Sequence, residues 1–415
     1  MVATKNTKAF YNTEIPSDWK IKKLGALVEI VSGVSPSLFN LDVVGKYPYL
    51  KVEDLNNCEK YQVSSREFSN DEKQLVPKNS VIFPKRGAAI LNNKVRINSV
   101  AVQMDSNLMA VYPKSEDLNF EYLYYQITFE QLHKIADTST IPQINNKHII
   151  PYSFPLPPLP EQKAIAQVLS KADAAIHTTE KLIAQKELRK KWLMQQLLTG
   201  KKRLKGFENT KWKIQALENF IKPIVREVPK PSTPYLGIGL RSHGKGTFLK
   251  HDEQPEKNSM DNFYVVRPND LIVNITFAWE QAIAIVRPED DGALASHRFP
   301  TYTFIEDKGH PDFFRFYILQ PRMKFMLQMI SPGGAGRNRV MSKSDFIKLE
   351  FLLPDYKEQT TIAQVLQAAD KEISLLKAKA EKLREQKKGL MQVLLTGKIR
   401  LNYDSSDFYD SNENK

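Results

Sequence analysis

Residues 161–176 read EQKAIAQVLSKADAAI, and residues 358–373 read EQTTIAQVLQAADKEI. The match runs without a gap from 161–204 to 358–401, with 22 identities in 44 positions. Both copies end on LLTGK, one further residue, and then RL. Such an internal repeat organises a chain. This chain alternates two dissimilar blocks with two near-identical segments.

The repeated segments are predicted to be long helices. In both, apolar or small residues recur at steps of four and three, which is the heptad pattern of a coiled coil. Gly200 and Gly397 stand where a helix takes a left-handed stop, and Asp355 with Glu358 can form a capping box. The predicted helix-pairing seam consists of Ile165, Leu169, Ile176, Ile183, Leu193, Leu197, Ile362, Leu366, Ile373, Leu376, Leu383, Leu390 and Leu394.

A single helix with a heptad seam would leave that seam in water, so we expect the two helices to pack on each other. They run antiparallel if a two-fold-like rotation relates the repeats. Dimerisation of two chains through the same seams is the alternative. Lys190 and Lys387 occupy seam positions. We interpret them as lysines whose aliphatic stems cover the coiled coil, with a role in register or an approach to DNA as the other readings.

The two blocks, roughly 25–150 and 218–350, hardly align with each other. Runs such as VIF (81–83) and LIVNI (271–275) predict strands, and 119–128 and 311–319 predict short helices. Fainter echoes flank the repeat, namely WKIKKL with WKIQAL and FPLP with FLLP.

The predicted fold class is therefore two mixed α/β (α+β) domains in tandem, separated by two long helices that pack as an antiparallel coiled coil with an internal pseudo-two-fold repeat. The predicted boundaries are 1–158 for the first domain, 159–204 for the first helix, 205–354 for the second domain, 355–401 for the second helix, and 402–415 for a disordered acidic tail.

Composition narrows the functional classes. The net charge of +13 and pI near 9.4 suit a polyanionic partner, although the excess lies almost wholly in the repeated segments, where solvated helix faces also explain it. The single cysteine, Cys58, excludes a disulfide framework and a zinc site built on several thiolates. The sequence has no apolar run of spanning length and no signal peptide at its start, which predicts a cytoplasmic protein without a membrane contact.

Sequence motifs for catalysis are missing. We find no phosphate-binding loop, no HExxH pattern, and no Asn-Pro-Pro-aromatic tetrapeptide of amino-methylating DNA methyltransferases. The prediction is a non-enzyme with no catalytic, cofactor or metal residues. A metal-dependent nuclease built from scattered acidic residues stays open as an alternative.

Polar loops in the blocks offer the side chains that bind DNA. Arg and Lys bind phosphates and guanine, Asn and Gln can pair with adenine, and glycine permits close approach of the backbone. Any one of these residues could equally belong to an ordinary solvent-exposed loop. The prediction therefore rests on the loops taken together and not on single residues. The candidate DNA-binding residues are Lys85, Arg86, Gln143, Asn145, Asn146, Lys147, Arg241, His243, Lys245, Arg337, Asn338 and Arg339.

The duplicated helix introduced by PLPPLPEQ (155–162) or LLPDYKEQ (352–359) and closed by LLTGK-RL resembles the specificity subunit of type I restriction-modification systems. The runs PQINNKHI (142–149) and GRNRVMSKSDF (336–346) resemble the segment that such proteins carry before the proline-rich start of the helix. The resemblance covers about residues 12–402. It does not extend to the sequences of the blocks, and so does not identify the DNA that they read.

The resemblance implies that each block is a target-recognition domain for one half of a split, asymmetric site in double-stranded DNA. The helix pair would set the gap and dock two methyltransferase subunits, which a restriction and translocase subunit would join. Adenine methylation and cleavage, with S-adenosylmethionine, ATP and Mg, would belong to those partners, and this chain would carry no cofactor. Besides the nuclease, the alternative is a coiled-coil adaptor that binds proteins without sequence-specific DNA binding.

Overall fold

A computed structural model describes residues 2–3, 6–11, 13–137, 141–334 and 339–401. The chain divides into two compact units, Met1–Glu180 with Lys379–Lys415 (unit 1) and Lys181–Ala378 (unit 2). Unit 1 thus contains the first block, the beginning of the first long helix and the end of the second. Unit 2 contains the second block and the complementary halves. The predicted tail, 402–415, lies outside the described residues.

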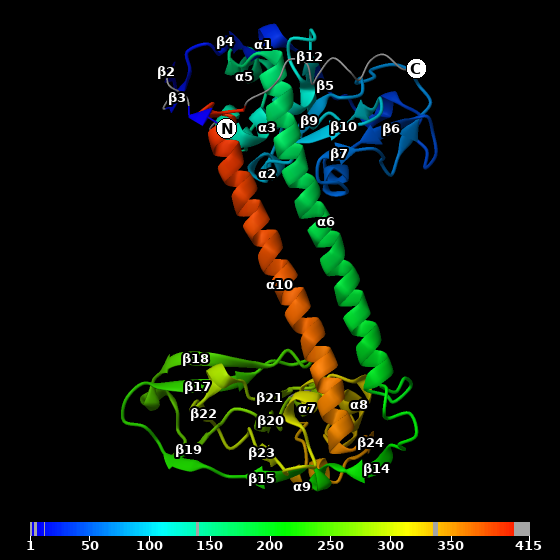
Figure 1. Cartoon of the computed structure of the whole chain (residues 1–415), viewed down its shortest axis with the longest axis vertical. Coiled ribbons are helices and arrows are strands. Elements are labelled where there is room, and N and C mark those ends of the chain that lie inside the picture. Colours follow the sequence, from blue (N-terminus) through cyan, green and yellow to red (C-terminus); the bar gives the residue numbers. More distant parts are fainter. Residues whose placement is uncertain (1, 4–5, 12, 138–140, 335–338, 402–415) are drawn as a thin grey trace. The chain divides into compact units, whose positions relative to one another are not determined.

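The two long helices are α6 (Leu159–Leu197) and α10 (Tyr356–Leu394), each of 39 residues (Figure 1). Both end before the predicted glycine stops, which have φ of +69° at Gly200 and +67° at Gly397. At the start of α10, the Glu358 amide donates to Asp355 Oδ1 at 2.9 Å, so this half of the predicted capping box is present.

Unit 1 is built on antiparallel strand pairs with two parallel exceptions, β10–β7 and β11–β6. Its helices are α1 (Leu24–Leu27), α2 (Ala88–Leu91), α3 (Phe120–Glu130), α4 (Leu132–Ile135) and α5 (Asn146–Ile149). The five-stranded sheet runs β5 (Val28–Ser32), β12 (Leu108–Pro113), β9 (Val81–Pro84), β10 (Arg96–Asn98), β7 (Tyr61–Gln62). A three-stranded sheet runs β11 (Gln103–Met104), β6 (Tyr47–Leu50), β8 (Phe68–Ser69). Two-stranded pairs join β13 (Ser153–Leu156) to β4 (Lys20–Lys23), β2 (Thr7–Phe10) to β3 (Thr13–Pro16), and β1 (Val2–Ala3) to β25 (Ile399–Arg400).

Unit 2 has the helices α7 (Pro311–Tyr317), α8 (Pro321–Met329) and α9 (Lys343–Ile347). Its four-stranded sheet runs β15 (Ile221–Ile224), β23 (Thr301–Phe304), β20 (Leu271–Val273), β21 (Ile283–Ile285). Its five-stranded sheet runs β16 (Glu227–Pro229), β19 (Asn262–Val265), β22 (Leu294–Ala295), β17 (Tyr235–Leu240), β18 (Thr247–Glu253). A two-stranded pair joins β14 (Lys213–Ala216) to β24 (Glu350–Leu353).

The two blocks share a backbone plan that their sequences do not reveal. The antiparallel order β5–β12–β9–β10 in unit 1 corresponds to β15–β23–β20–β21 in unit 2. The structure also explains the short sequence similarities beside the repeat. WKIKKL contains β4, and FPLP contains part of β13, its partner strand. WKIQAL and FLLP form the equivalent pair, β14 with β24.

Each block completes its hydrophobic core with residues of both long helices. In unit 1 the core includes Ile165 and Leu169 of α6 and Leu394 of α10. In unit 2 it includes Leu197 of α6 and Ile362 of α10. The helix ends are therefore structural parts of the blocks, and the core of unit 1 joins segments from the two ends of the sequence.

None of the thirteen predicted seam residues is classed as exposed; all are buried or half-buried. The helix halves pair within the chain, in each unit taken by itself. In unit 1, Asp173 of α6 contacts Lys387 of α10, and further along α6 Glu180 contacts the earlier Arg384. The order of these partners makes the pairing antiparallel, as predicted.

The two glycine stops differ in what surrounds them, and this difference is testable. Because φ is positive at both, Gly200→Ala and Gly397→Ala should each cost roughly 1 kcal/mol in unfolding free energy. A Cβ at Gly397 would also lie 2.4 Å from the Pro16 ring, whereas at Gly200 the nearest atom is 3.3 Å away. We expect a clearly larger fall in urea midpoint for Gly397→Ala; equal falls would contradict the close approach.

Candidate nucleic-acid interface and its supporting framework

The Glu of the repeated EQ dipeptide anchors the end of the other helix to the block. In unit 1, Glu161 is 1% exposed and receives hydrogen bonds from Trp19 Nε1 at 3.1 Å and Arg400 Nη2 at 2.6 Å. In unit 2, Glu358 receives them from Trp212 Nε1 at 3.0 Å and Arg203 Nη2 at 2.6 Å. The arginines come from the LLTGK-RL endings, so the two motifs of the repeat form one Glu–Arg–Trp cluster in each unit.

The Gln of the same dipeptide secures a second helix. Gln162 Oε1 accepts from the amide of Asn119 at 2.9 Å, and its Nε2 donates to the Pro157 and Asp117 carbonyls at 2.9 Å. Asn119 is the residue before α3. Gln359 makes the corresponding bonds to the His310 amide, before α7, and to the Pro354 and Lys308 carbonyls. An amide side chain is needed because it must accept and donate at once.

Ion pairs between the helix halves repeat as well. Lys387 Nζ lies 2.5 Å from Asp173 Oδ1 in unit 1, and Lys190 pairs with Asp370 at the equivalent positions in unit 2. Lys190 and Lys387 thus use their charge within the helix pair. These ion pairs agree better with a role of the two lysines in the register of the helix pair than with contact to DNA.

One part of this framework differs between the units. In unit 1, Tyr125 of α3 donates to Asp173 Oδ2 at 2.6 Å and accepts from Lys60 Nζ at 3.0 Å. Burial lowers the pKa of Lys60, and burial together with the Asp173 carboxylate raises the pKa of Tyr125. In unit 2 the place of Tyr125 is taken by Phe316, whose ring lies 5.5 Å from Lys190 Nζ. The polar network is therefore specific to unit 1.

In unit 1 the structure brings the two predicted DNA-binding loops together. Arg86 and Gln143 form an antiparallel bridge, the Gly87 amide donates to the Pro142 carbonyl at 3.0 Å, and the Ile144 amide donates to the Lys85 carbonyl at 2.9 Å. Arg86 is exposed, and burial, with a smaller contribution from Arg86, lowers the pKa of Lys85.

The segment that follows presents polar side chains next to this bridge. Asn145 precedes α5, and its amide donates to His148 Nδ1 at 3.1 Å. Asn145, Asn146 and Lys147 are exposed. Together with Arg86 they form a polar surface that we name the unit 1 loop surface.

In unit 2 a short 3-10 turn, Ala278–Glu280, contacts two of the predicted residues, His243 and Arg339. The His243 amide donates to the Glu280 carbonyl at 2.7 Å, and the Arg339 guanidinium lies 5.3 Å from the centre of the Trp279 ring. Arg241 stacks over Phe248 at 4.9 Å and donates to the Thr247 carbonyl. Arg241, His243 and Lys245 are exposed. With Arg339 they form the unit 2 loop surface; the predicted Arg337 and Asn338 lie outside the described residues.

The two loop surfaces occupy equivalent places in the shared plan. Ile144 and Met341 are both buried, and their backbone amides donate to the carbonyls of Lys85 and Ile275 respectively, at 2.9 and 2.8 Å. In each unit, the loop after a central strand is thereby tied to the segment before a short helix. Trp279 is the residue that sequence reasoning missed. Its position in FAWE, shortly after an apolar strand, was the available signal, since PKRG follows the equivalent strand in unit 1.

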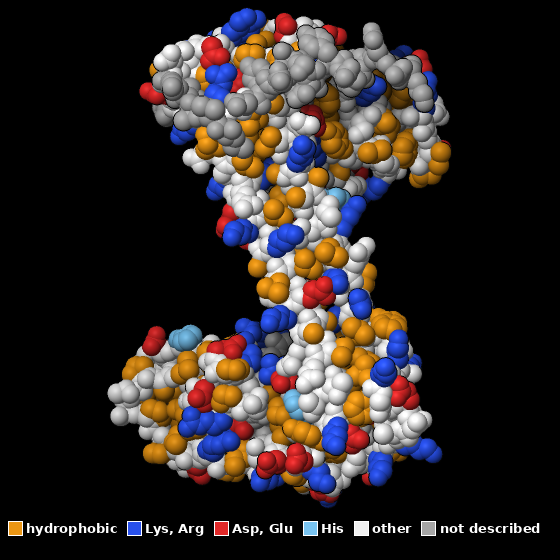
Figure 2. Space-filling view, viewed as in Figure 1, with side chains coloured by type: hydrophobic (Ala, Val, Ile, Leu, Met, Phe, Trp, Pro, Cys, Tyr) orange, Lys and Arg blue, Asp and Glu red, His pale blue; other side chains and the backbone are white. Residues whose placement is uncertain are grey.

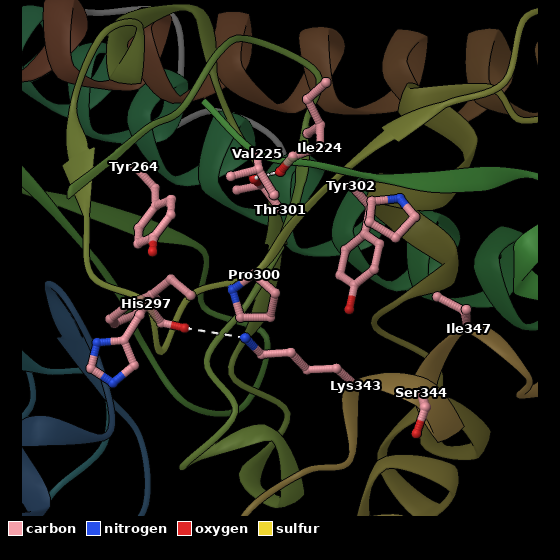
Figure 3. A pocket seen from close by; sticks show the side chains of 12 residues that line it. Ile224, Val225, Tyr264, His297, Pro300, Thr301, Tyr302, Lys343, Ser344 and Ile347 are labelled. Carbon is pink, nitrogen blue, oxygen red and sulfur yellow. Dashed lines mark hydrogen bonds between the residues drawn. The ribbon is translucent and has the colours of Figure 1, made fainter. Parts of the chain in front are cut away.

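The surface charge on one face and one cavity of unit 2 can be described among the residues that the structure covers. On the face drawn in Figure 2, Lys and Arg side chains are interspersed with acidic and apolar ones. A cavity of about 410 Å³ in unit 2 is lined mainly by apolar and aromatic residues, and at its edge Lys343 Nζ donates to the His297 carbonyl at 3.5 Å (Figure 3). The residues that line it include no paired carboxylates for acid–base chemistry.

Comparison with known proteins agrees with this duplicated plan. The model of the type I restriction modification DNA specificity domain matches residues 16–187 and again 226–385. Each match covers most of one block and much of the helix after it. The chain belongs to this family. Its members are non-catalytic DNA-recognition subunits, so the prediction of a non-enzyme that recognises a DNA target is confirmed at the level of the family.

Full-length relatives support the assignment. The chain is 27% identical over 426 residues, covering 94% of itself and 95% of the relative, to the putative type I restriction enzyme MjaX specificity subunit of Methanocaldococcus jannaschii. It is 23% identical over 427 residues to the MjaVIII specificity subunit of the same organism, covering 95% of the chain and 96% of the relative.

Solved structures show the same fold at low identity. The S subunit of a type I system from M. genitalium and the HsdS subunit of Thermoanaerobacter tengcongensis each match with a TM-score of 0.52 and 14% identity. Both matches cover 94% of this chain and 99% of the other. No helix among the residues that the structure describes is long and apolar enough to cross a bilayer.

The buried Glu–Arg pairs should dominate the stability of the framework. Arg203→Ala would leave the Glu358 carboxylate, whose side chain is 1% exposed, without its ionic partner, which costs about 3–5 kcal/mol. Arg384→Ala breaks the more exposed pair with Glu180 between the two long helices in unit 1 and should change stability little. Urea unfolding monitored by tryptophan fluorescence separates the two, and a similar small effect of both variants would contradict the proposed anchor.

The loop surfaces should contact DNA. Arg339→Ala is expected to weaken specific binding by about 1–3 kcal/mol, or roughly 5- to 150-fold, and to leave a shallower dependence on salt if the contact is to a phosphate. Arg267→Ala is the matched control, because it removes an exposed arginine of the same unit that is paired with Asp291. Binding is measured with the partner subunits present at several salt concentrations. Equal affinities for the two variants would remove Arg339 from the interface.

Proposed function

We propose that this specificity subunit reads a split, asymmetric DNA site, with the unit 1 loop surface contacting one half and the unit 2 loop surface the other. The observation that carries the proposal is the contrast between framework and loops. The Glu–Arg–Trp clusters and the Gln contacts are the same in the two units. The loops mounted on them differ. In unit 1 the backbones of Arg86 and Gln143 pair as an antiparallel β-bridge, whereas in unit 2 the Arg339 guanidinium lies over the Trp279 ring.

The chemistry of the two loops suits different base sequences. The unit 1 loop surface includes Arg86 and Asn145, and with the neighbouring Gln143 it supplies donors and acceptors for guanine and adenine edges. The unit 2 loop surface is richer in cations and has an aromatic ring beneath Arg339. Two different loop surfaces on equivalent frameworks would recognise two different half-sites, so the complete DNA site would not be a palindrome.

The helix pair is proposed to act as the spacer and as the docking surface for two methyltransferase subunits. A helix of roughly 40 residues is about 60 Å long at 1.5 Å per residue, which is enough to separate two half-sites on a duplex. Repeated surface segments would offer two equivalent docking sites, which suits two copies of one partner. Adenine methylation, and cleavage after a restriction and translocase subunit joins, are assigned to those partners with their S-adenosylmethionine, ATP and Mg.

The test is a base-resolution map of methyladenine in cells that contain the candidate methyltransferase, with and without this chain. The expected result is a split, asymmetric motif that appears only with the chain. Replacing residues 218–350 by the corresponding block of a relative should change one half of the motif and leave the other unchanged. Arg86→Ala and Arg339→Ala should likewise relax different halves.

The two alternative functions, a protein-binding adaptor and a nuclease, predict different results in these experiments. A protein-binding adaptor would produce no chain-dependent motif, and its DNA binding would show no sequence preference at moderate salt. A nuclease would nick DNA when the purified chain alone is given a divalent metal. Either result, with the methyltransferase demonstrably active, would overturn the proposal.

A further inference from the structure

Three side chains with metal-binding atoms meet on the surface of unit 1. His177 and Glu180 lie one turn apart on α6, and Glu59 precedes β7. One ligand atom from each of the three lies within 4.8 Å of the other two, and His177 Nδ1 is 3.4 Å from Glu59 Oε2. Among the residues that the structure describes, this is the group of His, Cys, Asp and Glu side chains that meets in this way.

The spacing fits a tetrahedral ion. Bonds of about 2.0–2.1 Å from zinc to imidazole nitrogen or carboxylate oxygen place neighbouring ligand atoms about 3.3 Å apart. The His177–Glu59 separation already has this length, and rotation of the Glu180 side chain would close the third corner. We propose that Glu59, His177 and Glu180 bind one divalent transition metal ion, with Zn²⁺ as the ion that this donor set fits best.

The donor types decide between metals. An imidazole ligand favours zinc and its neighbours over Mg²⁺ and Ca²⁺, which take oxygen ligands. Cys58 is adjacent in sequence but donates its thiol to Gln62 Oε1 at 2.8 Å, so the set consists of nitrogen and oxygen. Water would complete the coordination, and a cavity of about 760 Å³ that Glu59 and His177 help to line gives it access.

The local charges leave room for a cation. The carboxylates of Glu59 and Glu180 meet in this cluster beside the His177 ring. Arg384 pairs with Glu180 through Oε1, which leaves Oε2 for a metal, and it has Glu381 as a second partner at 2.9 Å. A bound ion would satisfy both carboxylates and join the segment before β7 to α6.

The repeat supplies an internal contrast. The positions of unit 2 equivalent to His177 and Glu180 hold Ser374 and Lys377, and Lys377 pairs with Glu187 at 2.6 Å. The Arg384–Glu180 contact of unit 1 is the same pair with its charges exchanged. At these helix positions unit 1 offers an imidazole and a carboxylate, whereas unit 2 offers a hydroxyl and an ammonium group, so the metal would fix the first block only.

The experiment titrates the full-length chain, stripped of metal by a chelator and dialysed, with Zn²⁺ in competition with a chromophoric chelator. We expect one zinc ion per chain and at least a tenfold loss of affinity in His177→Gln and in Glu59→Gln. The matched controls are Ser374→Ala at the equivalent helix position and His251→Gln, which removes an exposed histidine of unit 2. Both controls should bind as the unchanged chain does.

Two further measurements test the folding of the variants and the identity of the ligand atoms. Circular dichroism checks that each variant is folded, and Glu59→Gln, outside the helices, serves if His177→Gln unfolds. X-ray absorption at the zinc edge should show nitrogen and oxygen neighbours without sulfur. Equal zinc affinity in the unchanged chain and both ligand variants, tighter binding of Mn²⁺ than of Zn²⁺, or a sulfur neighbour would each overturn the proposal.

Discussion

The buried carboxylate of the EQ dipeptide is the constraint on which the rest of the structure depends. A carboxylate that is 1% exposed is costly unless it is fully paired, and Glu161 and Glu358 each meet an arginine and a tryptophan. Those partners come from distant parts of the chain. In unit 1, Arg400 follows the second long helix and Trp19 lies near the beginning of the sequence. One ion cluster therefore joins both ends of the sequence to the start of α6.

The framework could be predicted well from the sequence because its segments occur twice in the chain. The offset between the repeats predicted the long helices to within a few residues at their starts, the buried seam, and the antiparallel pairing. What it did not reveal was the reason for the identities. Glu161, Gln162 and Arg400 read in sequence as a polar helix start and a basic ending, and only their contact shows that Glu and Arg form one cluster and that Gln holds α3.

The blocks were harder to predict because their shared plan lies in the backbone. Strands of three to six residues, such as β9 and β20, fix an antiparallel order without fixing side chains, so two sheets of the same order need not look alike in sequence. The two candidate loops of unit 1 do lie side by side, since the backbone of Arg86 pairs with that of Gln143. Trp279 was missed because a tryptophan after a strand reads as core, and its role appears only when Arg339 is found above it.

Duplication of the framework also explains how the blocks can diverge. The long helices require few contacts from a block: a tryptophan for the buried Glu, a backbone amide just before a short helix for the Gln, and apolar residues to cover the helix ends. Even the contact beneath the seam is loosely specified, because Tyr125 makes it with a hydroxyl in unit 1 and Phe316 with a bare ring in unit 2. The side chains of the loop surfaces are not among these contacts, so they can change while the contacts remain. Under the proposed function, this separation would let substitutions in the loop surfaces alter recognition with little effect on the stability of the scaffold, because the effects of distant sites on stability are nearly independent.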